Sequence, residues 1–257
     1  MTDLIARSIC GSGPELALIH GDFANGATTW PKQVAEPPGR LLVVDRRGYG
    51  SSRDERPAYT IAEDAADFLA AIRASNMTRP IICGHSYGGV VAIEAARQAP
   101  DLPRGLVLIE PPLFAAAASD PDAVALAREV EEVRRRADAM SDEELAIAFF
   151  TALAGDEDAR RLRGGPRWAP VVAEARRFAH SEPPGAYPAE AVDELPRNLP
   201  VIVLSGDRSH PGLRAAARAI HDRLRSSRFI EVAGVGHAAQ ANAAAFVEAV
   251  RAILAVS

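Results

Sequence analysis

The sequence predicts an α/β fold, with a mostly parallel central sheet, helices on both of its faces and an inserted helical cap. Continuous apolar runs such as 16–20 and 41–45 alternate with helical stretches. Strands that are apolar throughout are covered on both faces, which is typical of parallel sheets. Between 112 and 196 the strand pattern stops and the sequence is helical and charged, which is too long an excursion for a simple loop. We therefore expect a core of 1–111 and 197–257 with a cap formed by 112–196.

Size and charge exclude several classes of protein. The 257 residues suffice for one large domain, and the formal net charge of −5 leaves no basic stripe of the kind that nucleic acid requires. No apolar run approaches the length of a membrane span, and the N-terminus lacks the basic and apolar segments of a secretory signal. We expect a cytoplasmic protein that acts on a small molecule, without a nucleic-acid or membrane partner. A homodimer stays open.

The first part of the chain is expected to alternate strands and helices. A first helix is predicted over 28–34. A second begins at Thr60 and Glu63, which form a capping box in which each side chain accepts from the other residue's backbone N–H. The predicted strands cover 4–10, 16–20 and 41–45.

The stretch Cys-Gly-His-Ser-Tyr-Gly-Gly at 83–89 joins a short apolar strand to a helix. So sharp a turn forces its central residue, Ser86, toward positive φ. It also leaves no room for side chains two residues before and after, where Gly84 and Gly88 stand. Gly-x-Ser-x-Gly between a strand and a helix is the pattern of a nucleophile elbow, which holds the serine hydroxyl clear of the backbone.

The later elements follow from the same patterns. A buried strand at 105–110 ends at two prolines, and 124–139 and 143–154 are the clearest cap helices. The chain then closes with a strand, a helix, a strand and a helix, expected over 200–205, 213–224, 228–232 and 243–254.

With these elements placed, the sequence resembles the α/β-hydrolase superfamily over essentially its whole length. Besides the elbow, the resemblance rests on three segments, namely His-Gly at 20–21, Asp-Arg-Arg-Gly-Tyr-Gly-Ser-Ser at 45–52 and Gly-His at 236–237. Each stands at or just after the C-terminal end of a predicted strand, where open parallel sheets bind their ligands. The resemblance implies an α/β-hydrolase fold with a serine nucleophile.

A serine hydroxyl is a weak nucleophile at neutral pH, so a base must take its proton and a carboxylate must orient that base. The family keeps its catalytic histidine in the loop after the last strand, which implies His237 as the base for Ser86. His85, inside the elbow, is interpreted as a packing residue.

The carboxylate has two candidates. Most family members carry it as Gly-x-x-Asp, and the matching stretch 206–209 ends in Ser209 instead. Glu110 ends an otherwise apolar strand, where an unpartnered carboxylate would be costly, and some α/β hydrolases place a glutamate there. Asp207 is the alternative acid, which also fits a turn residue. We favour Glu110.

The resemblance also implies an oxyanion hole made by two backbone N–H groups. One belongs to Tyr87, and the other to Asp22 or Phe23. If Asp22 donates, its carboxylate must turn away, because it would repel an oxyanion. The segment 45–50 is expected to order the neighbouring loop rather than to contact the substrate.

Substrate contacts are expected from the cap and from the loop 22–30. An arginine run could bind an anionic group, although such runs are also typical of solvated helix faces: Arg160, Arg161, Arg163 and Arg167. Candidate pocket residues are Trp30, Leu113, Phe114, Phe149, Phe150, Trp168, Phe178 and His210.

These observations favour a serine hydrolase that cleaves a small carboxylic ester or lactone through an acyl-enzyme on Ser86. A carbon–carbon bond hydrolase, a cofactor-free tailoring enzyme with the same triad, and a ligand-binding homologue without activity stay open. No cluster of Cys and His has metal-ligand spacing, so we expect no metal and no cofactor. Cys10 and Cys83 are interpreted as buried small hydrophobic residues.

Overall fold

A computed structural model describes residues 7–52 and 59–256. Residues 4–6 of the first predicted strand therefore lie outside the described residues. Within the described chain both cysteines are free, and no helix is long and apolar enough to cross a membrane.

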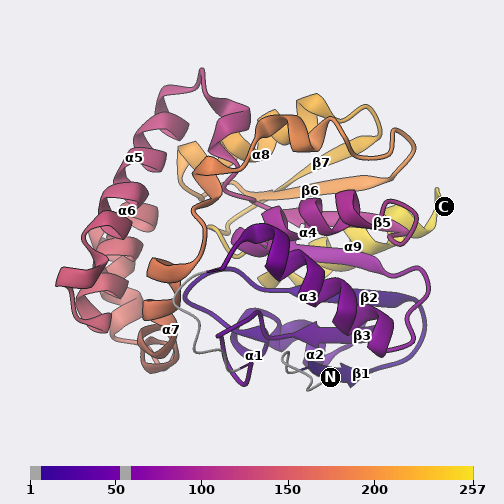
Figure 1. The fold of residues 1–257 in the computed structure, drawn as a ribbon, viewed down its shortest axis with the longest axis horizontal. Coiled ribbons are helices and arrows are strands. Elements are labelled where there is room, and N and C mark those ends of the chain that lie inside the picture. Colours follow the sequence, from indigo (N-terminus) through magenta and orange to yellow (C-terminus); the bar gives the residue numbers. More distant parts are fainter. Residues whose placement is uncertain (1–6, 53–58, 257) are drawn as a thin grey trace.

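A seven-stranded sheet forms the centre of the molecule, in the order β1-β3-β2-β4-β5-β6-β7 (Figure 1). Only the edge strand β1 is antiparallel to its neighbour, and the other pairs are parallel. The sheet confirms the predicted fold class. The strands are β1 (Arg7–Cys10), β2 (Glu15–Ile19), β3 (Arg40–Val44), β4 (Ile81–His85), β5 (Gly105–Ile109), β6 (Val201–Gly206) and β7 (Ser227–Val232).

Helices cover both faces of the sheet, as the apolar strands require. On one face α3 (Ile61–Ala74), α4 (Tyr87–Gln98) and α8 (Pro211–Arg223) share a core with alternate strand residues. On the other face α9 (Ala243–Leu254) packs with Trp30 and the remaining strand residues. Figure 1 shows α3 and α4 in front of the strands and α9 behind them.

Local chemistry explains where the early helices start. The predicted capping box is present at α3, since Thr60 Oγ1 accepts from the N–H of Glu63 and Glu63 accepts from the N–H of Thr60. The helix predicted over 28–34 is instead two short ones, α1 (Gly26–Thr29) and α2 (Pro31–Ala35). Pro31 has no N–H to continue α1, but it fits the first position of a new helix.

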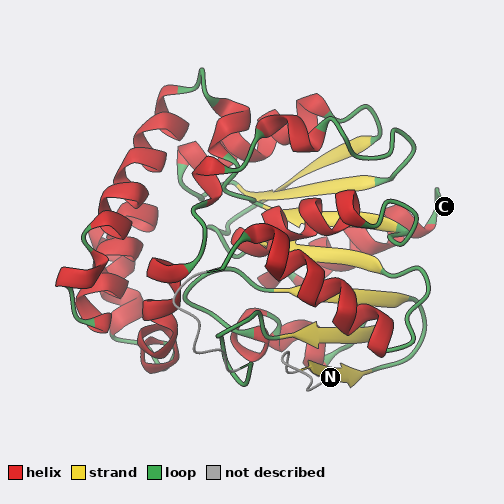
Figure 2. Cartoon of the chain, in the orientation of Figure 1, coloured by secondary structure: helices red, strands yellow, loops and turns green. Residues whose placement is uncertain are grey.

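The stretch between β5 and β6 contains only helices and loops (Figure 2). Its long helices α5, α6 and α7 lie together beside one end of the sheet (Figure 1). They share an apolar cluster with Phe23 and with Leu213 of α8. The elements are η1 (Phe114–Ala117), α5 (Pro121–Arg135), η2 (Ala137–Ala139), α6 (Asp142–Arg163), α7 (Trp168–His180), η3 (Pro184–Ala186) and η4 (Ala189–Val192).

Two features qualify the helical cap. Helix α6 is kinked at Gly155, whose φ is 81°, so the helix predicted over 143–154 ends where the kink begins. Tyr187, Val192 and Leu195 pack with α4 in the sheet core rather than with the cap helices. The limits of the cap stay a prediction, and packing favours an end before Tyr187.

Candidate active site

Ser86 stands between β4 and α4 with a φ of 53°. This left-handed conformation is strained for a residue with a side chain and persists only where the surrounding structure enforces it. The flanking glycines allow the strand and the helix to approach this closely, because a Cβ on Gly84 would lie 2.3 Å from the carbonyl oxygen of Gly88. The strand therefore meets the helix with no space left for side chains at these positions.

Glu110 follows β5, is fully buried and also has a positive φ, of 44°. Its Oε1 accepts from Ser205 Oγ at 2.7 Å and from the N–H of Gly206 at 3.0 Å. Its Oε2 accepts from Ser209 Oγ at 2.7 Å and from His237 Nδ1 at 2.6 Å. Four donors satisfy the carboxylate, and the bond to Nδ1 leaves Nε2 of His237 as the nitrogen that can accept a proton.

The alternative acid, Asp207, has another role. Its Oδ1 accepts from the backbone N–H of Gly234 at 2.7 Å and closes the turn after β7. The structure therefore places Glu110, and not Asp207, against His237. Ser209, which stands where the family usually has its acid, donates to that glutamate. This support by Ser205 and Ser209 was not predicted from the sequence. The serine at the usual position of the acid was the one feature that could have indicated it.

Ser86 and His237 line one pocket of about 300 Å³. His85 lines it too, 4.7 Å from the His237 ring between centroids, with its Nε2 3.1 Å from the His237 carbonyl oxygen. Burial, and then the nearby His237, lower the pKa of His85 to about 3. His85 is therefore neutral near pH 7 and has little basicity for taking the proton of Ser86.

The loop after β2 approaches the serine closely. A Cβ on Gly21 would lie 2.8 Å from Cβ of Ser86 and 3.3 Å from its Oγ. Phe23 has a φ of 55°, so the chain turns sharply there. Tyr87 is the first residue of α4, and the N–H of such a residue has no partner within its own helix. The backbone N–H groups of this loop and of Tyr87 could donate hydrogen bonds to a negatively charged oxygen beside Ser86.

The carboxylate of Asp22 is held by a fully buried Arg46. Asp22 Oδ1 accepts from Arg46 Nη1 at 3.0 Å and from Tyr49 OH at 2.8 Å. The remaining guanidinium nitrogens bond to Asp64, and the guanidinium carbon lies 3.9 Å from the centroid of the Tyr87 ring. The network ties the loop after β2 to the first residue of α4.

Burial perturbs the titration of this network. It raises the pKa of Asp64 to about 6, against the opposing effect of the Arg46 charge. Burial, followed by the charge of Arg46, also lowers the pKa of His20 well below its usual value. Neutral His20 can then accept, through Nε2, the backbone N–H of Arg46 at 2.9 Å.

Comparison with known protein families gives a match over nearly the whole chain. Residues 16–249 match the alpha/beta hydrolase family. The chain belongs to the alpha/beta hydrolase family.

Individual relatives match over shorter regions of the chain. An uncharacterized protein of Mycobacterium tuberculosis is 37% identical over 106 residues, which are 40% of this chain and 31% of that protein. A pimeloyl-[acyl-carrier protein] methyl ester esterase of Vibrio atlanticus is 37% identical over 120 residues, 46% of this chain and 44% of the esterase. The chain thus spans less than half the length of these curated relatives.

Solved structures share the fold of this chain at low identity. A hydrolase from Pseudomonas aeruginosa superposes with a TM-score of 0.73 at 21% identity, covering 97% of this chain and 94% of that one. At this identity the likeness shows the fold alone.

Three of the predicted substrate contacts line the pocket that contains Ser86 and His237, namely Phe149, Phe150 and Arg167. Phe149 and Phe150 of α6 do so together with Phe23, which stacks on Phe149 at 4.3 Å between ring centroids. Phe178 packs behind them, 5.0 Å from Phe149. Other apolar residues of the wall were not predicted, because no periodicity in the sequence distinguishes them from the core of the cap: Leu153, Leu162 and Val171.

Two other predicted contacts are elsewhere in the core. Trp30 is fully buried between α1 and α2, 5.9 Å from Phe246 between ring centroids, so its assignment to the pocket is wrong. Leu113 is fully buried with the residues of the sheet core. Both side chains point into packed layers because burial of apolar surface, not substrate contact, determines their place.

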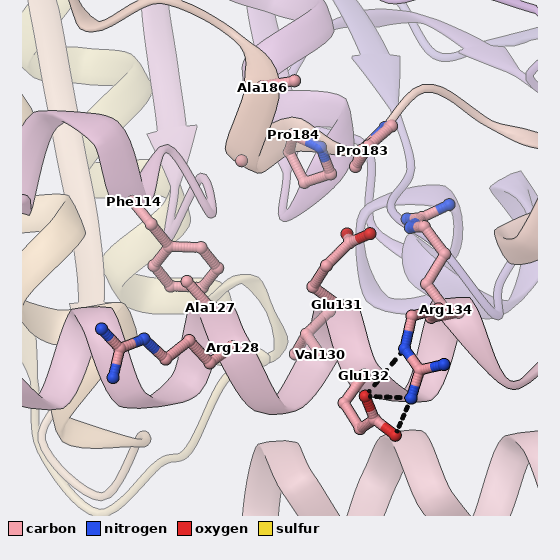
Figure 3. Close-up of a pocket in the computed structure, with 12 residues that line it drawn as sticks. Phe114, Ala127, Arg128, Val130, Glu131, Glu132, Arg134, Pro183, Pro184 and Ala186 are labelled. Atoms are coloured by element: carbon pink, nitrogen blue, oxygen red, sulfur yellow. Dashed lines mark hydrogen bonds and ion pairs between the residues drawn. The ribbon is translucent and has the colours of Figure 1, made fainter.

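Phe114, Trp168 and His210 also lie outside the catalytic pocket. Phe114 lines a separate hollow of about 530 Å³ between α5 and the segment 183–186 (Figure 3). This hollow is larger but contains neither the serine nor the histidine. Trp168 packs against the cap cluster. His210 caps α8, since its Nδ1 accepts from a backbone N–H at 3.0 Å.

The described residues offer no group of three or more His, Cys, Asp or Glu side chains that could hold a metal ion.

Proposed function

We propose that the protein is a serine hydrolase that cleaves a small carboxylic ester or lactone through an acyl-enzyme on Ser86. One observation carries the proposal. Ser86 and His237 line the same pocket, and Nδ1 of His237 is hydrogen-bonded to the buried carboxylate of Glu110 at 2.6 Å. This is the arrangement of nucleophile, base and orienting acid that activates a neutral serine.

The proposed reaction has two halves. His237 Nε2 takes the proton of Ser86 as Oγ attacks the ester carbonyl carbon, and the negative oxygen of the tetrahedral intermediate accepts from the N–H of Tyr87 and of Asp22 or Phe23. His237 then gives its proton to the leaving alkoxide. A water molecule next attacks the acyl carbon with His237 as base, and Ser86 regains its proton.

Glu110 supports His237 and does not itself take the proton of Ser86. Its charge stabilises the imidazolium that forms on His237, and its hydrogen bond keeps the ring in the required tautomer. The three core donors, Ser205, Gly206 and Ser209, hold the carboxylate in place, so little reorganisation is needed as charge develops.

Pocket size supports a group of modest size beside Ser86, and one relative supports ester chemistry. A pocket of about 300 Å³ is at the small end of ligand sites. The relative from Vibrio atlanticus acts, by its name, on the methyl ester of a pimeloyl-[acyl-carrier protein]. A serine nucleophile also argues against the epoxide hydrolases and haloalkane dehalogenases of this superfamily, which use an aspartate.

The test is hydrolysis of 4-nitrophenyl acetate and butyrate and of γ-butyrolactone by the wild type and by Ser86→Ala. We expect Ser86→Ala to lower kcat by at least about 10³-fold. A folded wild type that hydrolyses none of these compounds would contradict the proposal. Turnover of a diketone or binding without turnover would then favour the alternatives.

A further inference from the structure

The arginines between Arg160 and Arg167 differ in what their side chains contact. Arg161 and Arg163 form ion pairs of 3.0 and 3.1 Å with acidic side chains of α6. The Nε of Arg160 donates to a backbone carbonyl of the same helix at 3.2 Å. None of these three lines the catalytic pocket. They belong to the exposed face of the cap.

Arg167 differs from them in place and partners. It lines the catalytic pocket at the junction of α6 and α7. Among residues 7–52 and 59–256 it forms no ion pair and no side-chain hydrogen bond. It also directly precedes Trp168, the first residue of the thirteen-residue α7, and the partial positive charge of a helix N-terminus adds to its own.

No uncompensated negative charge in the pocket opposes an anion. Asp22 is the only acidic side chain in the described pocket lining, and Arg46 and Tyr49 bind its carboxylate. Glu110 lies behind His237 and does not line the pocket. Arg167 is therefore the one charged side chain of the described lining that lacks an opposite charge within the protein.

The rest of the cap wall is apolar. Phe149, Phe150 and Leu153 of α6 form it together with Leu162 and Val171. Arg167 is therefore the only charged side chain that the described cap residues contribute to this pocket.

We propose that Arg167 selects esters that carry a carboxylate separated from the ester group by a short aliphatic chain. The inference rests on the proposed function. The apolar wall accommodates the aliphatic chain, and the guanidinium binds the carboxylate at the outer side of the pocket, where a planar fork suits a planar anion. Because Arg167 is exposed, the contribution is partly screened and weakens as salt is added.

The experiment compares each acid with its neutral amide. Monomethyl glutarate and methyl glutaramate place the distal group on the acyl side, and the acetate esters of 4-hydroxybutanoate and of its amide place it on the alcohol side. We measure kcat/KM for both pairs with the wild type, Arg167→Gln and Arg167→Lys. Arg163→Gln is the matched control, because it removes the same charge from a side chain that lies outside the pocket.

We expect Arg167→Gln to lower the ratio of kcat/KM for the acid to that for the amide by about tenfold in one pair, mainly through KM. Arg167→Lys should retain part of the preference, and 0.5 M salt should reduce it in the wild type. A ratio unchanged in both pairs, or one lowered equally by Arg163→Gln, would overturn the inference. If the ester bonds of the amide-bearing compounds are cleaved in a Ser86-dependent way while the ratio is unchanged, only this inference fails. It also fails alone if neither pair is cleaved but the 4-nitrophenyl esters are hydrolysed. If none of these esters and lactones is hydrolysed, the proposed function fails with it.

Discussion

Replacing Glu110 by glutamine tests the orientation of His237 with almost no change in shape. In the wild type, Oε1 of Glu110 accepts hydrogen bonds from the Ser205 hydroxyl and the N–H of Gly206. Its Oε2 accepts from the Ser209 hydroxyl and from Nδ1 of His237. A glutamine whose oxygen keeps the first two bonds must point its amide N–H at the other two. The Ser209 hydroxyl can rotate to accept, but His237 can accept at Nδ1 only by moving its proton to Nε2.

That tautomer removes the base from Ser86. We expect kcat to fall by about 10⁴-fold, as when the triad acid of a serine protease becomes an amide, which equals about 5 kcal/mol of transition-state stabilisation. The assay is hydrolysis of 4-nitrophenyl acetate between pH 6 and 9, with urea unfolding to show that the variant is folded.

Asp207→Asn is the matched control. Its oxygen can still accept from the N–H of Gly234, and the residue does not touch His237. We expect less than about threefold loss of kcat, since surface turn substitutions have small effects. A loss below tenfold in Glu110→Gln, or an equal loss in Asp207→Asn, would refute the reasoning.

Three further substitutions probe the surroundings of the serine. Gly21→Ala places a Cβ 2.8 Å from Cβ of Ser86 and should lower kcat/KM by about 10²-fold in the ester assay, because small displacements of a nucleophile are costly; an unchanged rate would contradict the close approach. Arg46→Met leaves the Asp22 carboxylate without its charge partner and should lower the free energy of unfolding in urea by about 3–5 kcal/mol; a loss below 1 kcal/mol would argue against the network. His85, whose pKa is lowered to about 3, stays neutral in the fold but is protonated in the unfolded chain below about pH 6.5, so its stabilisation is present above that pH and is lost as the pH falls. His85→Gln should therefore lose about 2 kcal/mol less stability than the wild type between pH 7 and 5, and parallel pH curves would contradict the lowered pKa.

The sheet and the edge that carries the site could be predicted from the sequence, because backbone constraints there act over a few residues. Apolar strands without alternation require helices on both faces, and the glycines around Ser86 are the residues that a tight strand-to-helix turn without room for side chains requires. Glu110 was identifiable because a carboxylate that ends a buried strand needs a partner. In the structure that partner is His237.

The walls of the pocket could not be predicted, because the direction of a side chain depends on contacts between distant segments. Trp30 and Phe114 are aromatic residues in expected places, yet each packs against an element that the sequence does not position. Arg167 looks like its neighbours in the arginine run, and only the kinked path of α6 and the start of α7 bring it to the pocket. His210 was readable as a helix cap from the proline that follows it.

The central claim is that Ser86 is the nucleophile, and covalent labelling tests it most directly. The folded protein is treated with a fluorophosphonate, and the adduct is located by mass spectrometry of the intact chain and of its peptides. We predict a single adduct on Ser86, formed much more slowly in Glu110→Gln and at wild-type rate in Asp207→Asn. A folded protein that remains unlabelled, or an adduct on any other residue, would contradict the claim.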